Sequence, residues 1–231
     1  MARFVHGRPQ RVTHPGLVYH VLNRRVMRLP LFQKEDDYLA FERVLGESLV
    51  RLDGPDLLAW CLMPNHWHLV VQAGKGTNLS TWMQWVTVTH THRWHAHTHS
   101  AGEGPLYQGR FKSFPVQQDG HFLTLCRYVE ANARRAKLVK RAEAWRWCSL
   151  WVRRNRQSVL TRWLRPWPVD RPRKWLADVN RPIEEEALQG VRQSLTRGVP
   201  MGDTPWNTRI ARRLGLDITL RARGRPRKDR Q

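Results

Sequence analysis

The sequence has few cysteines and no long apolar run. Its three cysteines, Cys61, Cys126 and Cys148, are far apart, form no CxxC pair and stand among apolar residues. This predicts small buried thiols in a reducing compartment, without a chemical role. No apolar run approaches the roughly 20 residues that cross a bilayer, and residues 1–16 lack the apolar segment of a secretory signal. We therefore expect a cytoplasmic protein without a membrane span.

Acidic residues are also scarce. The chain has 19 Asp and Glu against 40 Lys and Arg, a formal net charge of +21 on 231 residues. Such a surplus implies a polyanionic partner, most commonly nucleic acid. Binding to a membrane surface would require the basic residues on one amphipathic helix, whereas they are spread over the whole chain. The 12 tryptophans suit stacking on unpaired bases, although core packing is their other use.

Hydrophobic periodicity predicts strands and helices in the order β-α-β-β-α-β-α over the first 140 residues. The expected strands are 17–25, 57–63, 66–72 and 106–116, and the expected helices are 34–52, 81–95 and 120–138. Pro64-Asn65 marks a hairpin or sharp bend between the two middle strands. This order is that of a ferredoxin-like split βαβ unit, so we predict an α+β fold with an antiparallel sheet and packed helices.

The composition changes after about residue 150. We therefore predict a folded domain over 1–150, a basic extension over 151–220 and a disordered tail over 221–231. Within the extension, the Trp- and Pro-rich residues 152–175 are expected to be extended and partly ordered, and residues 183–220 to hold one or two short helices. Arg223, Arg225 and Arg227 in the tail suggest either an AT-hook-like minor-groove arm or a non-specific basic tail.

Two histidines, His66 and His68, stand at i and i+2 on a predicted strand. Their side chains therefore project from one face, whereas Trp67 and Leu69 point to the opposite, apolar side. Two neighbouring imidazoles can take adjacent positions on one metal ion. Two half-exposed histidines on a sheet are the other interpretation of this pattern.

Tyr128 follows the last predicted strand on an arginine-rich helix. Asn132, four residues later, would lie on the same helical face. A tyrosine at such a position can simply be a packing residue. Together with the paired histidines, however, the pattern suggests one site with two imidazoles, an amide oxygen from Asn132 and a phenol.

Five histidines between His90 and His99 suggest a second metal site or a pH-sensitive, DNA-facing patch. The neighbouring residues are typical of a helix end that frays into a loop. We therefore favour the patch over a dedicated metal site.

The chain resembles the REP-associated tyrosine transposases, a branch of the single-tyrosine HUH transposases, in which U is a bulky hydrophobic residue, here Trp67. The matching stretches are LVYHVLNRR (17–25), WCLMPNHWHLVV (60–71), GPLYQGRFKSFPV (104–116), HFLTLCRYVEANARRAKLV (121–139), WRWCSL (145–150), RRLGL (212–216) and GRPRK (224–228). Small departures are Ala133, where the family often has Pro, and Lys137, where Gly is common.

The resemblance implies a metal-dependent single-strand DNA endonuclease and transferase that acts on hairpin-forming repetitive extragenic palindromes. His66, His68 and Asn132 would hold Mg²⁺ or Mn²⁺, and Mn²⁺ suits two imidazoles better. Tyr128 would attack the phosphodiester and form a 5′-phosphotyrosine. The resemblance also implies a nucleoid-associated bacterial protein that acts as a monomer or a homodimer on single-stranded and hairpin DNA.

Three further cations, Arg110, Lys112 and Arg127, are expected to contact the DNA backbone, with solvated surface charge as the alternative. Two other functions stay open. One is a domesticated protein that binds structured DNA without cutting it. The other is a ribosome- or RNA-associated basic protein, which gives no reason for the paired histidines and the tyrosine.

Overall fold

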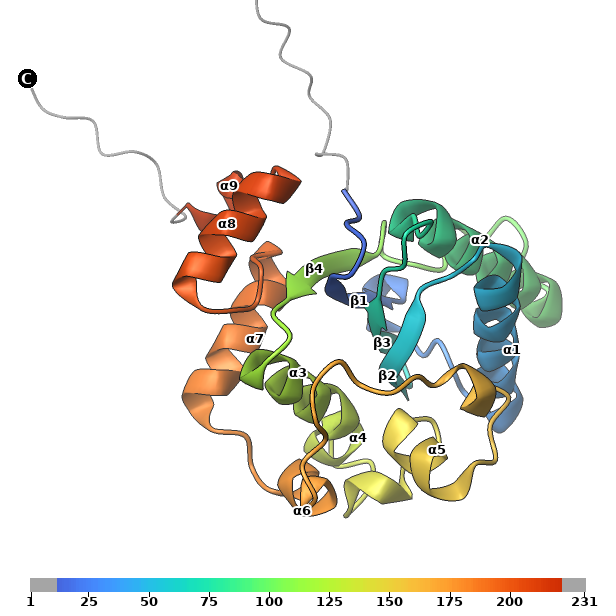
Figure 1. The fold of residues 1–231 in the computed structure, drawn as a ribbon. Helices are drawn as coiled ribbons and strands as arrows, with labels where there is room; N and C mark the ends of the chain where they lie inside the picture. The colour runs from blue at the N-terminus through green and yellow to red at the C-terminus, as the bar shows by residue number, and fades with distance from the viewer. Residues whose placement is uncertain (1–11, 222–231) are drawn as a thin grey trace, which may run out of the picture.

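The computed structural model describes residues 12–221, and a four-stranded sheet lies at its centre (Figure 1). All neighbouring strands are antiparallel, in the order β2-β3-β1-β4. The strands are β1 Val18–Arg24, β2 Asp56–Met63, β3 His66–Gln72 and β4 Lys112–Val116, and the first three helices are α1 Glu35–Arg51, α2 Leu79–Thr98 and α3 Gly120–Glu130. The ferredoxin-like α+β prediction is confirmed.

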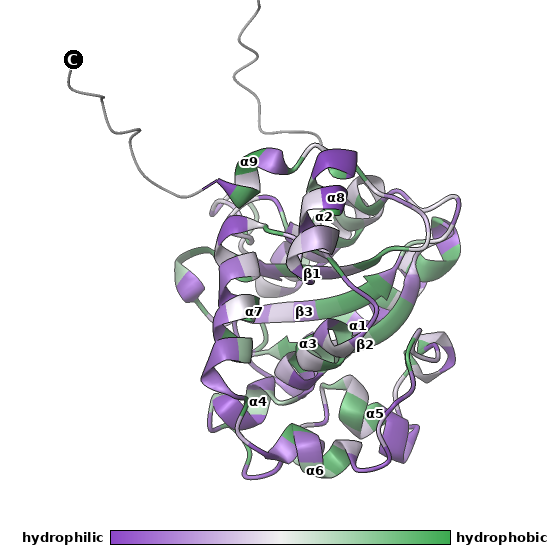
Figure 2. Cartoon of the chain, turned by 60° about the vertical axis from the view of Figure 1, so that its left-hand side comes forward, coloured by the Kyte–Doolittle hydropathy of each residue, from purple (hydrophilic) through white to green (hydrophobic). Residues whose placement is uncertain are grey.

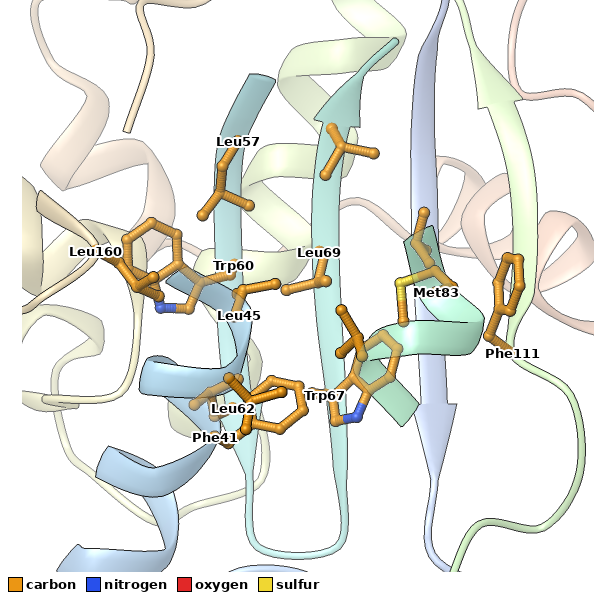
Figure 3. Packing of buried hydrophobic residues seen from close by; sticks show 14 of the residues in the cluster. Phe41, Leu45, Leu57, Trp60, Leu62, Trp67, Leu69, Met83, Phe111 and Leu160 are labelled. Atoms are coloured by element: carbon orange, nitrogen blue, oxygen red, sulfur yellow. The ribbon is translucent and has the colours of Figure 1, made fainter. Parts of the chain in front are cut away.

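One face of the sheet packs on α1 and α2. The strands alternate, so Trp67 and Leu69 of β3 join Trp60 and Leu62 of β2 in one apolar cluster with Phe41 of α1. Figure 3 shows these side chains interdigitating between the strands and the helices. This cluster fixes the register of β3, because a slip of one residue would turn Trp67 to the other face.

The opposite face packs on α3 and on the C-terminal helices. Val70 and Phe114 lie there with Phe122 and Val129 of α3 in a second apolar cluster. The two clusters put the sheet between two helical layers, as Figure 1 shows. Both histidines of the His66-Trp67-His68 motif therefore belong to the α3 side.

Two predicted elements have different bounds. The last strand begins at Lys112 rather than at residue 106, because Gly109 has a φ of 147° and the preceding residues turn across the end of β1. There Tyr107 makes an isolated bridge to Arg25. Helix α2 begins at Leu79 rather than at residue 81, and its cap is Asn78, whose side chain accepts from the two amides that follow Leu79.

The predicted helix 120–138 is interrupted. Helix α3 ends at Glu130, Ala131 has a φ of −84° and a ψ of 0°, and a one-turn helix, α4 Asn132–Arg135, follows. The helix is therefore interrupted between Tyr128 and Asn132. The prediction of one continuous helix was wrong at this point.

The remaining elements are short. They are η1 Val26–Arg28, η2 Ala142–Ala144, α5 Ser149–Asn155, η3 Thr161–Trp163, α6 Trp175–Asn180, α7 Glu185–Arg197, α8 Thr204–Leu214 and α9 Asp217–Leu220. Figure 2 shows a largely hydrophilic α7 beside hydrophobic strands, as expected of a helix that packs with one face only. No helix within residues 12–221 is long and apolar enough to cross a membrane.

Residues after 150 cover both edges of the sheet. At the β2 edge, Leu164 makes a parallel bridge to Leu57, and the Arg165 amide donates to the Leu57 carbonyl over 2.9 Å. At the β4 edge, the Met201 amide donates to the Pro115 carbonyl over 2.9 Å. Covered edges prevent pairing with another chain. The expectation of a partly ordered 152–175 segment therefore understates its order.

The division into three parts stays a prediction. Helix α5 runs across residue 150, so the polypeptide enters the extension inside a helix. Arg223, Arg225 and Arg227 lie outside the described residues, and so does the predicted AT-hook-like tail.

Candidate active site

The two histidines of β3 lie next to each other beneath α3. The ring centroids of His66 and His68 are 4.9 Å apart, and His68 is buried whereas His66 is half-buried. Trp67, between them, belongs to the apolar cluster on the other face. The structure therefore has the side-chain alternation that the sequence predicts.

Each of these imidazoles has one nitrogen engaged and one available. His66 Nδ1 lies 2.6 Å from the side-chain oxygen of Asn65, and His68 Nδ1 lies 2.9 Å from Nε2 of His20. Burial lowers the pKa of His66 to about 4 and lowers the pKa of His68 well below its ordinary value. Both rings are therefore neutral at pH 7, as metal ligation through Nε2 requires.

Tyr128 of α3 lies against the same pair. Its ring centroid is 5.9 Å from that of His68, in an edge-to-face arrangement. The guanidinium of Arg135, from α4, lies 4.2 Å from the centroid of the Tyr128 ring. A guanidinium over the ring face makes a cation–π contact and puts a positive charge beside the phenol.

A cavity of about 710 Å³ opens over these three side chains. Among the described residues, its wall has no acidic side chain and includes several cations besides His66, His68 and Tyr128: Arg24, Arg28, Arg110 and Lys112. A cavity with this charge attracts a polyanion and repels a bare cation. The C-terminal half of α7 completes the wall with Leu195 and Thr196, so the extension takes part in building the cavity.

Asn132 lies near the site but outside the wall of the cavity. It is buried on α4, its side-chain nitrogen has no hydrogen-bond partner within residues 12–221, and it is not among the described residues that line the cavity. This nitrogen is a hydrogen-bond donor, whereas a metal ion would bind the side-chain oxygen. Its role as a third metal ligand stays a prediction.

The predicted DNA contacts separate into three groups. Arg110 and Lys112 both reach the cavity, Arg110 from the loop before β4, and Lys112 Nζ also donates to the Leu195 carbonyl over 3.2 Å. Arg127 instead donates to the carbonyls of Asp178 and Pro182 over 2.7 and 2.6 Å. Its guanidinium holds the connection between α6 and α7 and is therefore not aimed at the cavity. The tail arginines lie outside the described residues.

The histidine run of α2 gives no metal site within the described part of the chain. His90 is buried in the α1–α2 layer, with Nδ1 2.7 Å from the Tyr107 hydroxyl, whereas His92, His97 and His99 are exposed. Within residues 12–221 no group of three or more His, Cys, Asp or Glu side chains could hold a metal ion. That finding also applies to His66 and His68, which form only a pair of ligands.

A divalent cation fits this pair on one condition. The two Nε2 atoms supply two adjacent nitrogen ligands, and Asn132, two residues beyond the end of α3, would have to supply its side-chain oxygen as a third. No carboxylate of residues 12–221 lines the cavity, so the charge of the ion must be balanced by oxygens from elsewhere. Phosphate is the natural source of such oxygens, so the donor set fits a metal that binds together with DNA.

Sequence reasoning missed His20, Arg24 and Arg135. All three stand in the quoted motifs, and the period of β1 puts His20 on the face of Val18, hence beneath α3. The pairing of β1 with β3 could not be read from that pattern. The contribution of α7 to the cavity left no local signal at all.

The chain was compared with known proteins. The family model described as "Transposase IS200 like" matches residues 13–132, more than half of the 231 residues. The chain belongs to the IS200-like transposase family. The matched stretch begins before β1 and ends at Asn132, so it includes His66, His68 and Tyr128. No curated protein matches this transposase.

Two solved structures are similar to this transposase. The structure of a REP-associated tyrosine transposase bound to a REP hairpin is 20% identical, covers 74% of this chain and 93% of that chain, and has a TM-score of 0.52. It shows that the two proteins share their fold. A transposase candidate from Deinococcus radiodurans R1 is 15% identical, covers 54% of this chain and 96% of that chain, and has a TM-score of 0.38.

Proposed function

We propose that this transposase cleaves and rejoins single-stranded DNA beside hairpin-forming repetitive extragenic palindromes, through a covalent link at Tyr128. The observation that carries the proposal is the position of Tyr128 against His68 in a cavity lined by cations. The solved structure with the shared fold is a transposase bound to a REP hairpin, which supports the choice of DNA.

In the proposed reaction, Tyr128 Oη bonds to phosphorus while the bond from phosphorus to the 3′ oxygen breaks. The products are a 5′-phosphotyrosine and a 3′-hydroxyl, with the phenol proton lost to water and one proton taken up by the departing oxygen. The number of phosphodiester bonds is unchanged, so a second 3′-hydroxyl can reverse the step and join strands. Arg135 beside the phenol and Arg24 and Arg110 in the wall stabilise the added negative charge.

His66 and His68 would hold Mg²⁺ or Mn²⁺ through Nε2, with Asn132 as a third ligand. When bound, the ion supplies Lewis acidity to the scissile phosphate. The wall cations place the DNA backbone over the two histidines, which orients the phosphate toward Tyr128.

The test is the covalent adduct. A labelled hairpin oligonucleotide from beside the encoding gene, incubated with the protein and Mn²⁺, should give an adduct that survives denaturing gel electrophoresis. Tyr128→Phe should abolish the adduct and leave hairpin affinity nearly unchanged, because only the nucleophilic oxygen is lost. Tyr107→Phe is the matched control, since the Tyr107 hydroxyl is bonded to His90 in the opposite layer.

An adduct formed by the Tyr128→Phe variant would show that another residue is the nucleophile. Tight hairpin binding by the wild-type protein without any adduct would favour the non-cleaving alternative. Both outcomes are distinct from a folding defect, which the hairpin affinity detects.

A further inference from the structure

His20 lies beneath the candidate metal ligand and takes no direct part in the proposed reaction. Its ring is fully buried on β1, its Nε2 lies 2.9 Å from His68 Nδ1, and the two ring planes are inclined by only 16°. The edge of Phe114 packs on His20 at a centroid distance of 5.0 Å, which holds the ring in place. The strand pairing of β1 with both β3 and β4 fixes all three residues.

One proton lies in the contact between the two rings. Each neutral imidazole carries one N–H and one lone pair, so one ring donates to the other across the 2.9 Å between His20 Nε2 and His68 Nδ1. Two arrangements satisfy the hydrogen bond. Either His20 donates and His68 keeps its proton on Nε2, or His68 donates from Nδ1 and leaves the Nε2 lone pair open.

We propose that His20 is a positioning residue that accepts the Nδ1 proton of His68 and so directs the Nε2 lone pair of His68 to a cation in the cavity. This inference rests on the proposed function, in which His68 is a metal ligand. Ligating histidines in metal sites commonly donate their other N–H to such a partner, which fixes the tautomer and the ring orientation.

The environment of His20 predicts the opposite arrangement when no metal is bound. When His68 donates to His20, the His20 proton lies on Nδ1, a buried atom without a hydrogen-bond partner within residues 12–221. An unpaired buried N–H is unfavourable, so without a metal the pair should adopt the opposite arrangement. Ligation at His68 Nε2 therefore reverses the hydrogen bond to His20, which a purely structural histidine pair would not do.

The first experiment measures the Co²⁺ affinity of the protein saturated with a hairpin oligonucleotide, whose phosphates supply the oxygen ligands that the cavity lacks. Co²⁺ favours imidazole ligands and absorbs visible light. His20→Phe keeps an aromatic ring against Phe114 and removes the acceptor, and it should weaken Co²⁺ binding about 10- to 100-fold. His20→Gln offers an amide oxygen near the position of Nε2 and should restore most of the affinity. The combined His66→Ala and His68→Ala variant gives the baseline from the exposed histidines.

Equal Co²⁺ affinity in the wild-type protein and the His20→Phe variant would overturn the role of His20 and leave the metal site intact. Wild-type binding no stronger than the double-alanine baseline would instead refute the metal site, and this inference with it. Thermal melting establishes that each variant is folded.

The second experiment needs no variant. Long-range ¹H–¹⁵N correlation spectra of histidine-labelled wild-type protein distinguish the two tautomers of each ring. With the hairpin oligonucleotide bound, His68 should carry its proton on Nε2 without metal and on Nδ1 when Zn²⁺ is added. The same tautomer under both conditions would contradict the proposal, even if His20→Phe failed to fold.

Discussion

Glu42 is a buried carboxyl that has a hydrogen-bond partner for only one of its two oxygens within residues 12–221. It lies inside α1, one oxygen accepts from the Ser158 hydroxyl over 2.9 Å, and the other has no partner within residues 12–221. Burial raises the pKa of Glu42 to about 7 from 4.5. Between pH 4.5 and pH 7, therefore, Glu42 carries a proton in the folded protein and has lost it in the unfolded chain.

The sign of the resulting pH dependence follows. Because the pKa is raised on folding, the carboxyl is best tolerated below pH 4.5, and stability falls as the pH rises toward 7. Glu42→Gln keeps an acceptor for Ser158 and removes the charge. At pH 8 it should stabilise the fold by on the order of 2–3 kcal/mol, and at pH 4.5 by far less. Urea unfolding of both proteins at the two pH values measures this, and an equal difference at both would be inconsistent with the raised pKa.

The paired histidines give a second prediction at this scale. His66→Ala with His68→Ala should abolish Mn²⁺-stimulated adduct formation, because the two Nε2 ligands are lost together. His97→Ala with His99→Ala is the matched control, since these exposed histidines have the same i, i+2 spacing at the end of α2. Undiminished stimulation in the first variant, or an equal loss in both, would count against the assignment.

At the scale of elements, the extension is fixed to the tyrosine helix through Glu130. This carboxylate is fully buried and accepts from the Ser149 hydroxyl over 2.6 Å and from the indole N–H of Trp175 over 2.7 Å. It stands between Tyr128 and Asn132 in the sequence, where α3 ends. One buried group thus joins α3, α5 and α6 below the candidate site.

Removing one donor to Glu130 should loosen this junction. Trp175→Phe keeps most of the buried ring and leaves one carboxylate oxygen unpaired, so the free energy of unfolding should fall by about 1–3 kcal/mol. Trp163→Phe is the control, because the Trp163 indole nitrogen is buried without a partner within residues 12–221. Chemical denaturation compares the two, and a similar effect of both would mean that ring volume and not the hydrogen bond is decisive.

At the scale of the whole molecule, a net charge of +21 attracts nucleic acid from every side. The proposed function requires some cations to contact phosphate in the cavity and others only to add to the field. The two kinds differ in how DNA affinity depends on salt, because only a direct phosphate contact displaces a bound counterion.

Two pairs of arginines separate these effects. Arg24→Gln with Arg110→Gln removes two charges from the cavity wall and should lower the slope of log affinity against log salt by about 1–2. Arg43→Gln with Arg51→Gln removes the same charge from the exposed side of α1, on the opposite layer, and should leave the slope almost unchanged. Equal slopes for the two variants would refute the cavity as the DNA site.

The sequence by itself determined which segments are strands, where the first two helices lie, and on which face of the sheet each strand residue lies. Alternation along β3 puts His66 and His68 on the side away from Trp67, because strand side chains alternate by covalent geometry. In the same way, the 3.6-residue period of α1 determined which of its side chains face the sheet in the opposite layer. Such patterns are local, so they can be read from the sequence without knowing which segments pack against each other.

Only the tertiary structure decided which residues meet. The hydrogen bond from His20 to His68 spans 48 positions, and α7 reaches the cavity from more than 120 residues after His66. The break at Ala131 is not marked by a glycine or a proline in the sequence. Contacts between distant segments depend on strand order and on the path of the extension, which no local pattern encodes.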